Sequence, residues 1–483
     1  MVYDVAIIGG GVIGCTIARE LSRLKLKTVV LEKENDVASG SSKANSGIVH
    51  GGYDCTPGTL KARFNVEGNT MFDDLSQTLD FPFRRNGSMV LAFDQDEIQH
   101  LEKLLMQGIK NGVNNLEIIN REAALRLEPN LSDEVAAALL IPSGGIVCPY
   151  EMTFAFAENA AENGVEFRLN FPAESVEKQA GFFSVAGPAG EVRARILINA
   201  AGLYADVINN MLSQSRFTIT PRRGEYCLLD KTEGELVTHT LFQLPTKAGK
   251  GILVSPTVDG NLLLGPTSQD IGDKELKTTT REGLQAVLLA ARRDVKSLPA
   301  GKIITSFAGL RAIDETGDFI IGRSPDVENL INVAGIASPG LTSAPAIAVH
   351  VAGLVRELTQ AEPNPDFHPV RKAFPRFRHM SDEQRNRAIA KNPDYGYVVC
   401  RCEQVTKAEI LAAMRGPIGV RDVDAIKRRT RAGMGRCQGG FCMTRVSEII
   451  AQELGIPLNE VTKNGGGTNL LMDLNKQDLH EGE

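Results

Sequence analysis

The apolar and polar positions at the start of the chain predict a strand, a helix and a second strand. Residues Tyr3–Ile8 form an apolar run that stops at a glycine cluster, which is typical of a buried strand. The run Thr28–Glu32 is also apolar but ends in an acid. Between them, apolar residues recur at helical spacing on one face, at Ile13, Ile17, Leu21 and Leu24. The pattern therefore predicts a βαβ unit.

A glycine fingerprint lies at the turn between the first strand and the helix. Gly9, Gly11 and Gly14 fit G-x-G-x-x-G, and Val12 and Ile13 open the helix behind them. Such glycines let the backbone turn tightly and approach a pyrophosphate at the helix N-terminus, and the acid that ends the second strand, Glu32, can accept from ribose hydroxyls. We expect a dinucleotide site here. The alternative is a glycine-rich turn of an unrelated α/β fold.

A polar, glycine-rich loop after Glu32 favours FAD over NAD. The segment Ala38–Gly52 offers hydroxyls and backbone amides along an extended cofactor. Near its end, the apolar Ile48 and Val49 separate the polar residues from two glycines. A plain surface loop is the alternative. From this region we expect FAD contacts at Lys33, Ser41, Ser42, Asn45, Ser46, Gly47 and Val49.

Two later segments repeat the strand-to-turn pattern. Ala194–Ile198 runs into a turn that contains Ala200 and Gly202, and Leu330–Gly335 leads to a helical stretch over Ala344–Leu358. A helix start directed at a flavin would stabilise the negative charge of its reduced form. The expected cofactor contacts are therefore Ala200, Gly202, Gly335, Gly340, Leu341 and Thr342.

Together these motifs resemble the D-amino-acid-oxidase superfamily of FAD enzymes, from Met1 to about Leu358. Within it, Pro221–Tyr226, Gly249–Thr257 and Ala308–Arg311 are similar to anaerobic-type glycerol-3-phosphate dehydrogenases and L-2-hydroxyglutarate dehydrogenases. The resemblance implies an α/β fold with a Rossmann-like FAD lobe (about 1–80, 145–205 and 305–360) and an antiparallel-sheet substrate lobe (about 81–144 and 206–304). It also implies that Gly309 and Arg311 contact FAD.

The resemblance also suggests which side chains meet the substrate. Arg311 would grip an anion, since a guanidinium suits carboxylate or phosphate. His50 could accept the hydroxyl proton, Tyr226 would line the substrate side, and Lys250 is a second candidate anion contact. Each has a structural alternative: an ion pair for the arginine, a structural histidine, simple packing for the tyrosine and a solvated lysine.

Departures from the family leave the substrate open. Related glycerol-3-phosphate dehydrogenases tend to carry cations where this chain has Tyr53-Asp54 and Gly340. We favour oxidation of sn-glycerol 3-phosphate to dihydroxyacetone phosphate, with an L-2-hydroxy acid such as 2-hydroxyglutarate second and an amino acid third.

The chain changes character after Leu358. Residues 361–395 are rich in Pro, Arg and polar types and predict a linker arm. Residues 396–456 predict a small helical domain, with helices from near Thr406, where Glu409 completes a capping box, over Val423–Thr430 and over Thr444–Leu454. Residues 457–483 form a tail, glycine-rich and then acidic.

The last four of the eight cysteines predict a metal centre. They follow a C-x-C, 34 residues, C-x4-C spacing and are Cys400, Cys402, Cys437 and Cys442. Four thiolates on two short loops suit a [2Fe–2S] cluster, whereas C-x-C is tight for zinc, the main rival. The pattern resembles bacterioferritin-associated-ferredoxin-like [2Fe–2S] domains, over about Tyr397–Leu454. The other four cysteines predict buried thiols.

Charge and composition limit the classes of partner that the protein is expected to bind. Residues 371–437 hold 16 Lys/Arg and 7 Asp/Glu in a chain whose net charge is −6. This basic block suits an anionic cluster or an acidic electron carrier. We expect no nucleic-acid binding, because the block shows no recognised nucleic-acid-binding fold. We expect electrons to reach a flavoprotein, ferredoxin or quinone-linked subunit, in a hetero- or homo-oligomer.

Two further expectations concern location and class. We identify no signal peptide and no membrane-spanning stretch in the sequence, so we expect a cytoplasmic protein. Any attachment to the membrane would be through a partner. The competing class is an electron-transfer or iron-mobilising module without small-molecule turnover.

Overall fold

The computed structural model describes residues 1–244 and 251–472 and divides into two compact units. The N-terminal unit comprises Met1–Lys33 and Val37–Arg371. The C-terminal unit comprises Glu34–Asp36 and the chain from Lys372 onward. No helix among the described residues is long and apolar enough to cross a membrane.

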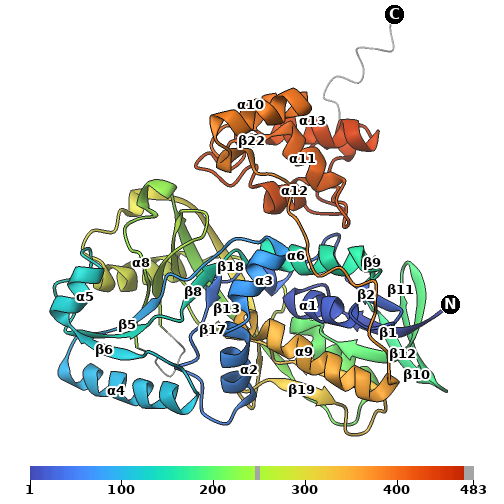
Figure 1. Ribbon diagram of the computed structural model, residues 1–483, viewed down its shortest axis with the longest axis horizontal. Helices are drawn as coiled ribbons and strands as arrows, with labels where there is room; N and C mark the ends of the chain where they lie inside the picture. The colour runs from blue at the N-terminus through green and yellow to red at the C-terminus, as the bar shows by residue number, and fades with distance from the viewer. Residues whose placement is uncertain (245–250, 473–483) are drawn as a thin grey trace, which may run out of the picture. The chain divides into compact units, whose positions relative to one another are not determined.

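An eight-stranded sheet carries the predicted βαβ unit (Figure 1). Its central strands are parallel, in the order β12-β1-β2-β9, with β20 beside β12. The strands are β1 (Val2–Ile8), β2 (Thr28–Leu31), β9 (Glu166–Arg168), β10 (Ser175–Gln179), β11 (Phe182–Gly187), β12 (Gly190–Asn199), β19 (Ile320–Arg323) and β20 (Leu330–Ala334). All four strands predicted for the cofactor lobe are present, with boundaries shifted by a few residues.

Helices pack against one another beside this sheet. Helix α1 (Val12–Leu21) contacts α6 (Pro149–Glu162) and α9 (Gly340–Thr359), and α9 also contacts α2 (Leu60–Asn69). A Cβ on Gly68 would lie 2.1 Å from the Thr342 carbonyl oxygen, so only glycine lets α2 approach the start of α9 this closely. The helices of this lobe also include α3 (Phe72–Leu79) and α7 (Ala205–Leu212).

A second, nine-stranded sheet forms the other lobe, and all its pairings are antiparallel except β5 with β14. Its strands are β5 (Ser88–Ala92), β6 (Glu117–Asn120), β7 (Ala137–Ile141), β13 (Ile219–Leu229), β14 (Thr240–Phe242), β15 (Leu253–Pro256), β16 (Leu262–Gly265), β17 (Gln269–Asp270) and β18 (Ile303–Asp314). Helices α4 (Gln95–Lys110), α5 (Arg121–Leu127) and α8 (Arg281–Asp294) pack on it. Strand β18 pairs along β13 and so belongs here, although the expected third piece of the FAD lobe began at 305.

A small three-stranded sheet carries the segment before His50. Strand β8 (Gly145–Val147) pairs with β3 (Ile48–Val49) on one side and β4 (Phe83–Arg84) on the other. The pairing holds the end of the predicted FAD loop in an extended conformation.

The C-terminal unit is mostly helical and has its own core. It contains α10 (Asp382–Lys391), β21 (Val398–Cys400), β22 (Val405–Thr406), α11 (Lys407–Met414), α12 (Val423–Thr430) and α13 (Met443–Leu454). Ile410, Ile426 and Ile450, one from each of the last three helices, are fully buried in its core. The predicted capping box of Thr406 and Glu409 is present. The expected linker arm differs from the structure, because α10 and its own capping box lie within 361–395.

Candidate cofactor and active sites

Close backbone packing explains the glycine fingerprint. Gly9 has φ +111°, and a Cβ there would lie 2.4 Å from the Ala200 carbonyl oxygen. A Cβ on Gly14 would lie 1.9 Å from the Gly9 carbonyl oxygen. Neither distance is tolerable, so glycine is required both where β1 turns toward β12 and where α1 starts.

Glu32 and Ser42 face the same turn. The Glu32 Oε2 atom accepts a hydrogen bond from the Gly10 amide at 2.6 Å, and the Ser42 hydroxyl oxygen accepts from the Val12 amide at 2.9 Å. Gly11 at the N-cap of α1 offers no side chain to cap the helix. A helix start with an acid beside it fits the pyrophosphate and ribose of a dinucleotide.

The predicted FAD loop lies against β18. The Ser41 hydroxyl donates to the Leu310 carbonyl at 2.5 Å, and a Cβ on Gly309 would lie 1.8 Å from the Ala44 carbonyl oxygen. Within the loop, the Asn45 Oδ1 atom accepts from the Gly47 amide at 2.9 Å. The fold therefore brings Ser41 against Leu310 and Ala44 against Gly309, and the contacts of the loop residues with FAD stay a prediction.

The start of α9 is joined to the end of this loop. The Thr342 hydroxyl oxygen accepts from the His50 amide at 2.9 Å and donates to the Ile48 carbonyl at 3.3 Å. Thr342 is fully buried. The hydroxyl thus holds Gly340 and Leu341, the first residues of α9, next to β3 and its buried Val49.

The remaining expected contacts are placed less directly. Gly202 and Gly335 have φ of +57° and +65°, which favours glycine at each strand-to-turn junction. The Lys33 ammonium lies 3.1 Å from Glu275 and 4.5 Å above the Tyr204 ring. Its side chain is therefore directed to these two residues, and its contact with FAD stays a prediction.

Arg311 lies on β18 and presents a buried donor. Its Nη2 donates to the Thr267 carbonyl at 2.7 Å, while its Nε is buried and has no hydrogen-bond partner among the described residues. Burial lowers the pKa of this guanidinium. Because a buried cation is costly unless it is paired, the arrangement suits an anionic ligand.

Tyr226 neighbours Arg311 across two adjacent strands. Burial raises the pKa of its phenol, and the positive charge of Arg311 acts in the opposite direction. Its ring stacks on Phe307 with centroids 4.7 Å apart, and its hydroxyl lies 3.4 Å from the Ser46 hydroxyl. Tyr226 thus links the substrate sheet to the FAD loop, although stacking on Phe307 also gives it a packing role.

His50 lies at the other end of the same loop, beside a residue that the sequence did not single out. Its Nε2 lies 3.3 Å from the Ser338 hydroxyl, and its ring centroid lies 5.8 Å from that of Phe242. Ser338 is 288 positions away in the chain, so no local pattern could have paired the two. A hydroxyl at this distance can orient the imidazole.

Two other expectations concern the anion site. Lys250 lies outside the described residues, so its role stays a prediction. Tyr53 is 3% exposed and packs its ring edge-on to Phe242. Neither Tyr53 nor Gly340, at the start of α9, supplies a cation.

The four clustered cysteines meet in the C-terminal unit. The sulfurs of Cys402 and Cys437 are 3.5 Å apart, and the Cys442 thiol donates to the Cys400 sulfur. That hydrogen bond lowers the pKa of Cys400 to about 6 and raises the pKa of Cys442. Four converging thiols, one of them already favoured as thiolate, fit a thiolate-bound metal centre.

Backbone amides also donate hydrogen bonds to these sulfurs. The Cys400 sulfur accepts from the amides of Gly433 and Glu403, and the Cys437 sulfur accepts from those of Gly439 and Phe441. Amide donors stabilise negative sulfur and tune a bound cluster.

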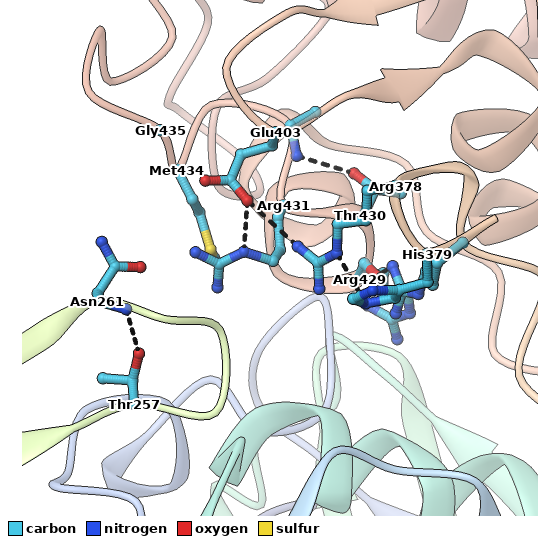
Figure 2. A network of polar contacts seen from close by, with 12 residues as sticks. Thr257, Asn261, Arg378, His379, Glu403, Arg429, Thr430, Arg431, Met434 and Gly435 are labelled. Carbon is cyan, nitrogen blue, oxygen red and sulfur yellow. Dashed lines mark hydrogen bonds and ion pairs between the residues drawn. The ribbon is translucent and has the colours of Figure 1, made fainter. Parts of the chain in front are cut away.

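A buried ion-pair network supports the loop that carries Cys402. The Glu403 carboxylate accepts from Arg431 at 2.8 Å and from Arg378 at 3.2 Å (Figure 2). The Glu403 side chain is 1% exposed. Part of the basic block therefore stabilises the fold of the domain itself.

The other four cysteines are separate from this group. Each is a buried thiol of the N-terminal unit that forms no disulfide: Cys15, Cys55, Cys148 and Cys227. The prediction that they are buried thiols is confirmed.

Comparison with known proteins agrees with both sites. Residues 4–354 match the family model described as FAD dependent oxidoreductase, which spans the glycine turn, His50 and Arg311. The chain belongs to the FAD dependent oxidoreductase family. Residues 398–452 match the BFD-like [2Fe-2S] binding domain, with all four clustered cysteines inside the match. The cofactors of this family member are therefore FAD and a [2Fe–2S] cluster.

Similar proteins carry related names. The chain is 49% identical to a glycerol 3-phosphate dehydrogenase of Caloramator mitchellensis, over 99% of this chain and all of the relative. It is 35% identical to a glycerol 3-phosphate oxidase of Mycoplasma pneumoniae, over 75% of this chain and 96% of the relative. The solved structure of L-alpha-glycerophosphate oxidase from Mycoplasma pneumoniae, with FAD bound, has a TM-score of 0.73 at 34% identity, covering 78% of this chain and 99% of that one.

L-2-hydroxyglutarate dehydrogenases are also similar. The mitochondrial enzyme of Caenorhabditis elegans is 31% identical over 55% of this chain and 63% of its own length.

Proposed function

We propose that the protein oxidises sn-glycerol 3-phosphate to dihydroxyacetone phosphate and passes the electrons singly to a partner protein. The observation that carries the proposal is Arg311, a half-buried side chain on the substrate sheet whose Nε is buried and has no hydrogen-bond partner among the described residues. The similarity to glycerol 3-phosphate dehydrogenase, which extends over both units, supports the choice of substrate.

The residues of the chain divide the work. When bound, FAD would supply the acceptance of hydride and the [2Fe–2S] cluster would supply single-electron transfer. Arg311 binds the anionic group and orients the substrate. His50, held by Ser338 and Thr342, accepts the hydroxyl proton. Tyr226 lines the substrate side, and the residues of the glycine turn, the loop and the start of α9 hold the dinucleotide. Lys250 is the candidate for a second anion contact.

An L-2-hydroxy acid such as 2-hydroxyglutarate is the second candidate substrate. Arg311 would bind a carboxylate as well as a phosphate, and the buried Tyr53 and Gly340 stand where related glycerol-3-phosphate dehydrogenases tend to carry cations. We place the enzyme in the cytoplasm, as one component of an oligomer with its electron acceptor.

The test is an anaerobic absorption spectrum of the purified protein before and after the substrate is added. Bleaching of the flavin bands by sn-glycerol 3-phosphate would support the proposal. Bleaching by L-2-hydroxyglutarate alone would keep the architecture and replace the substrate. Bands that respond to neither compound would contradict both.

A further inference from the structure

The cysteine group has one edge that opens to solvent. Cys400 and Cys442 are 1% and 2% exposed, whereas Cys402 is exposed and Cys437 is partly so. Electron transfer between proteins needs a short path to the surface. The Cys402 and Cys437 edge provides that path.

An exposed aromatic residue stands beside this edge. The Phe441 amide donates to the Cys437 sulfur, yet the Phe441 side chain is 88% exposed. Its backbone is thus tied to a cluster ligand while its ring is presented to solvent. A single exposed apolar side chain is common on protein surfaces. The residues around Phe441 therefore decide whether it marks an interaction site.

Other exposed apolar side chains lie at the start of β21 and at the start of α13. Tyr397 and Val398 are 47% and 41% exposed, and Met443 is 39% exposed. Cys400 on the same strand contacts Cys442, and Tyr397 lies within electrostatic reach of Arg445 on α13. The strand and the start of α13 therefore share one face, and contiguous exposed apolar residues mark interaction sites.

The exposed charges in the two segments that form this face are positive, and the partly exposed Glu448, one turn further along α13, pairs with Arg445 at 3.0 Å. Within 397–404 and 435–445, the charged residues are Arg401, Arg436, Arg445 and Glu403. The three arginines are exposed, whereas Glu403 is buried in ion pairs. A surface of this kind is complementary to an acidic partner, which it would also attract from a distance.

We propose that Tyr397, Val398, Arg401, Phe441, Met443 and Arg445, here called the cluster-edge patch, dock a small acidic protein with a one-electron redox centre. The proposal rests on the proposed function, because that function supplies the electrons. Each docking event oxidises the reduced site by one electron and reduces the centre of the partner by one. Two events follow each oxidised substrate molecule.

The experiment uses the full chain loaded with FAD and cluster, and an oxidised plant-type [2Fe–2S] ferredoxin as the acidic probe. Binding is measured by calorimetry over a range of salt concentrations, and substrate-driven ferredoxin reduction is followed separately. Phe441→Ala should weaken binding at least about tenfold, as loss of an aromatic anchor does. Leu289→Ala, at an equally apolar and 74% exposed position on α8, should leave it unchanged.

The charge contribution is tested with a second pair of variants. Arg445→Gln should weaken binding and flatten its salt dependence, whereas Arg415→Gln, which removes an exposed arginine paired with Glu453, should not. The cluster absorbance of each variant verifies that the domain is loaded. Because Arg445 lies on the exposed side of α13 and pairs only with Glu448 among the described residues, this variant tests the patch even if Phe441→Ala loads poorly.

Failure of the patch can be told apart from failure of the proposed function. If the substrate does not bleach the flavin but ferredoxin still binds through Phe441 and Arg445, the function is wrong and the patch stands. If Phe441→Ala and Arg445→Gln bind ferredoxin within twofold of wild type, the patch is wrong. A variant that changes only the oligomeric state would show a contact between copies of the chain, which also overturns the proposal.

Discussion

Asp36 and Arg429 form a bidentate ion pair across 393 positions of the chain. The two guanidinium nitrogens of Arg429 donate to the two carboxylate oxygens of Asp36 at 2.7 and 2.8 Å, and Arg428 adds a third bond at 2.8 Å. Asp36 is fully buried. The short segment Glu34–Asp36, which follows β2, is thereby part of the C-terminal unit.

Asp36→Asn should lower the free energy of unfolding of the C-terminal unit by about 3 kcal/mol, because it leaves buried guanidinium groups without their carboxylate. Thermal unfolding followed by circular dichroism measures the effect. Asp424→Asn, which breaks the exposed pair with Lys463, should cost less than about 1 kcal/mol. Equal losses of stability in the two variants would show that the buried ion pair contributes no more than the exposed one.

The same pair predicts a pH dependence. Burial raises the pKa of Asp36, but Arg429 and Arg428 outweigh it, so the folded pKa lies below the ordinary value. Its contribution to stability is therefore complete above the unfolded pKa of about 3.9 and is lost as the pH falls through the folded pKa. The difference in the free energy of unfolding between wild type and Asp36→Asn should stay constant from about pH 7 to about pH 5 and should narrow as the pH falls below about 4.

Asp294 should give stability the opposite dependence on pH. Its Oδ1 accepts from Gln243 at 3.1 Å, its Oδ2 is buried with no hydrogen-bond partner among residues 1–244 and 251–472, and burial raises its pKa to about 7. The folded state holds a proton that the unfolded state loses near pH 4, so stability falls as the pH rises from about 4 to about 7. Asp294→Asn should remove that slope.

Urea unfolding at pH 5 and pH 8 tests this prediction. The asparagine variant should be more stable than wild type at pH 8 by more than about 1 kcal/mol, with a smaller difference at pH 5. Asp96→Asn, at an exposed position on α4, serves as control and should follow the wild-type profile. A wild-type slope that survives in Asp294→Asn would assign it to another group.

Arg311→Gln should raise the KM for sn-glycerol 3-phosphate about a hundredfold, because the anion loses a charged, bidentate partner. Arg222→Gln is the matched control: Arg222 faces Arg311 in the strand register but pairs with the exposed Asp270. Steady-state kinetics with a dye acceptor measures both variants. A KM that rises equally in the two variants would remove the special role of Arg311.

His50→Asn should lower kcat by a factor of about 10² to 10⁴ if the imidazole accepts the substrate proton. Ser338→Ala should lower it less and shift its pH profile, since a positioning residue acts through His50. In the double variant the losses should not multiply. FAD content, measured after denaturation, should stay at the wild-type level; a loss of FAD instead would make His50 a cofactor-binding residue.

Cys402→Ser should abolish the broad visible absorbance of the cluster and leave the flavin bands, because one of four thiolates is missing. Substrate-driven dye reduction should persist while ferredoxin reduction stops. Cys227→Ser replaces a buried thiol on β13 and should keep the cluster. Spectra in which both variants retain it would exclude Cys402 as a ligand.

Local patterns in the sequence were sufficient for many of these features. The glycine turn, the strand ending at Glu32, the capping box at Thr406 and the cysteine spacing follow from backbone conformation and side-chain periodicity over a few residues. Each of these was found where the sequence predicted it.

Only the tertiary structure decided how distant segments combine. It placed Ser338 beside His50, the Thr267 carbonyl against Arg311, β18 in the substrate sheet and Asp36 in the C-terminal unit. It also left Phe441 exposed beside a cluster ligand. These contacts join residues up to several hundred positions apart, and their free energy comes from burial and pairing that exist only once the chain is folded. The chemistry of the cofactors was therefore readable in the sequence, whereas the support for that chemistry and the face offered to an electron acceptor were not.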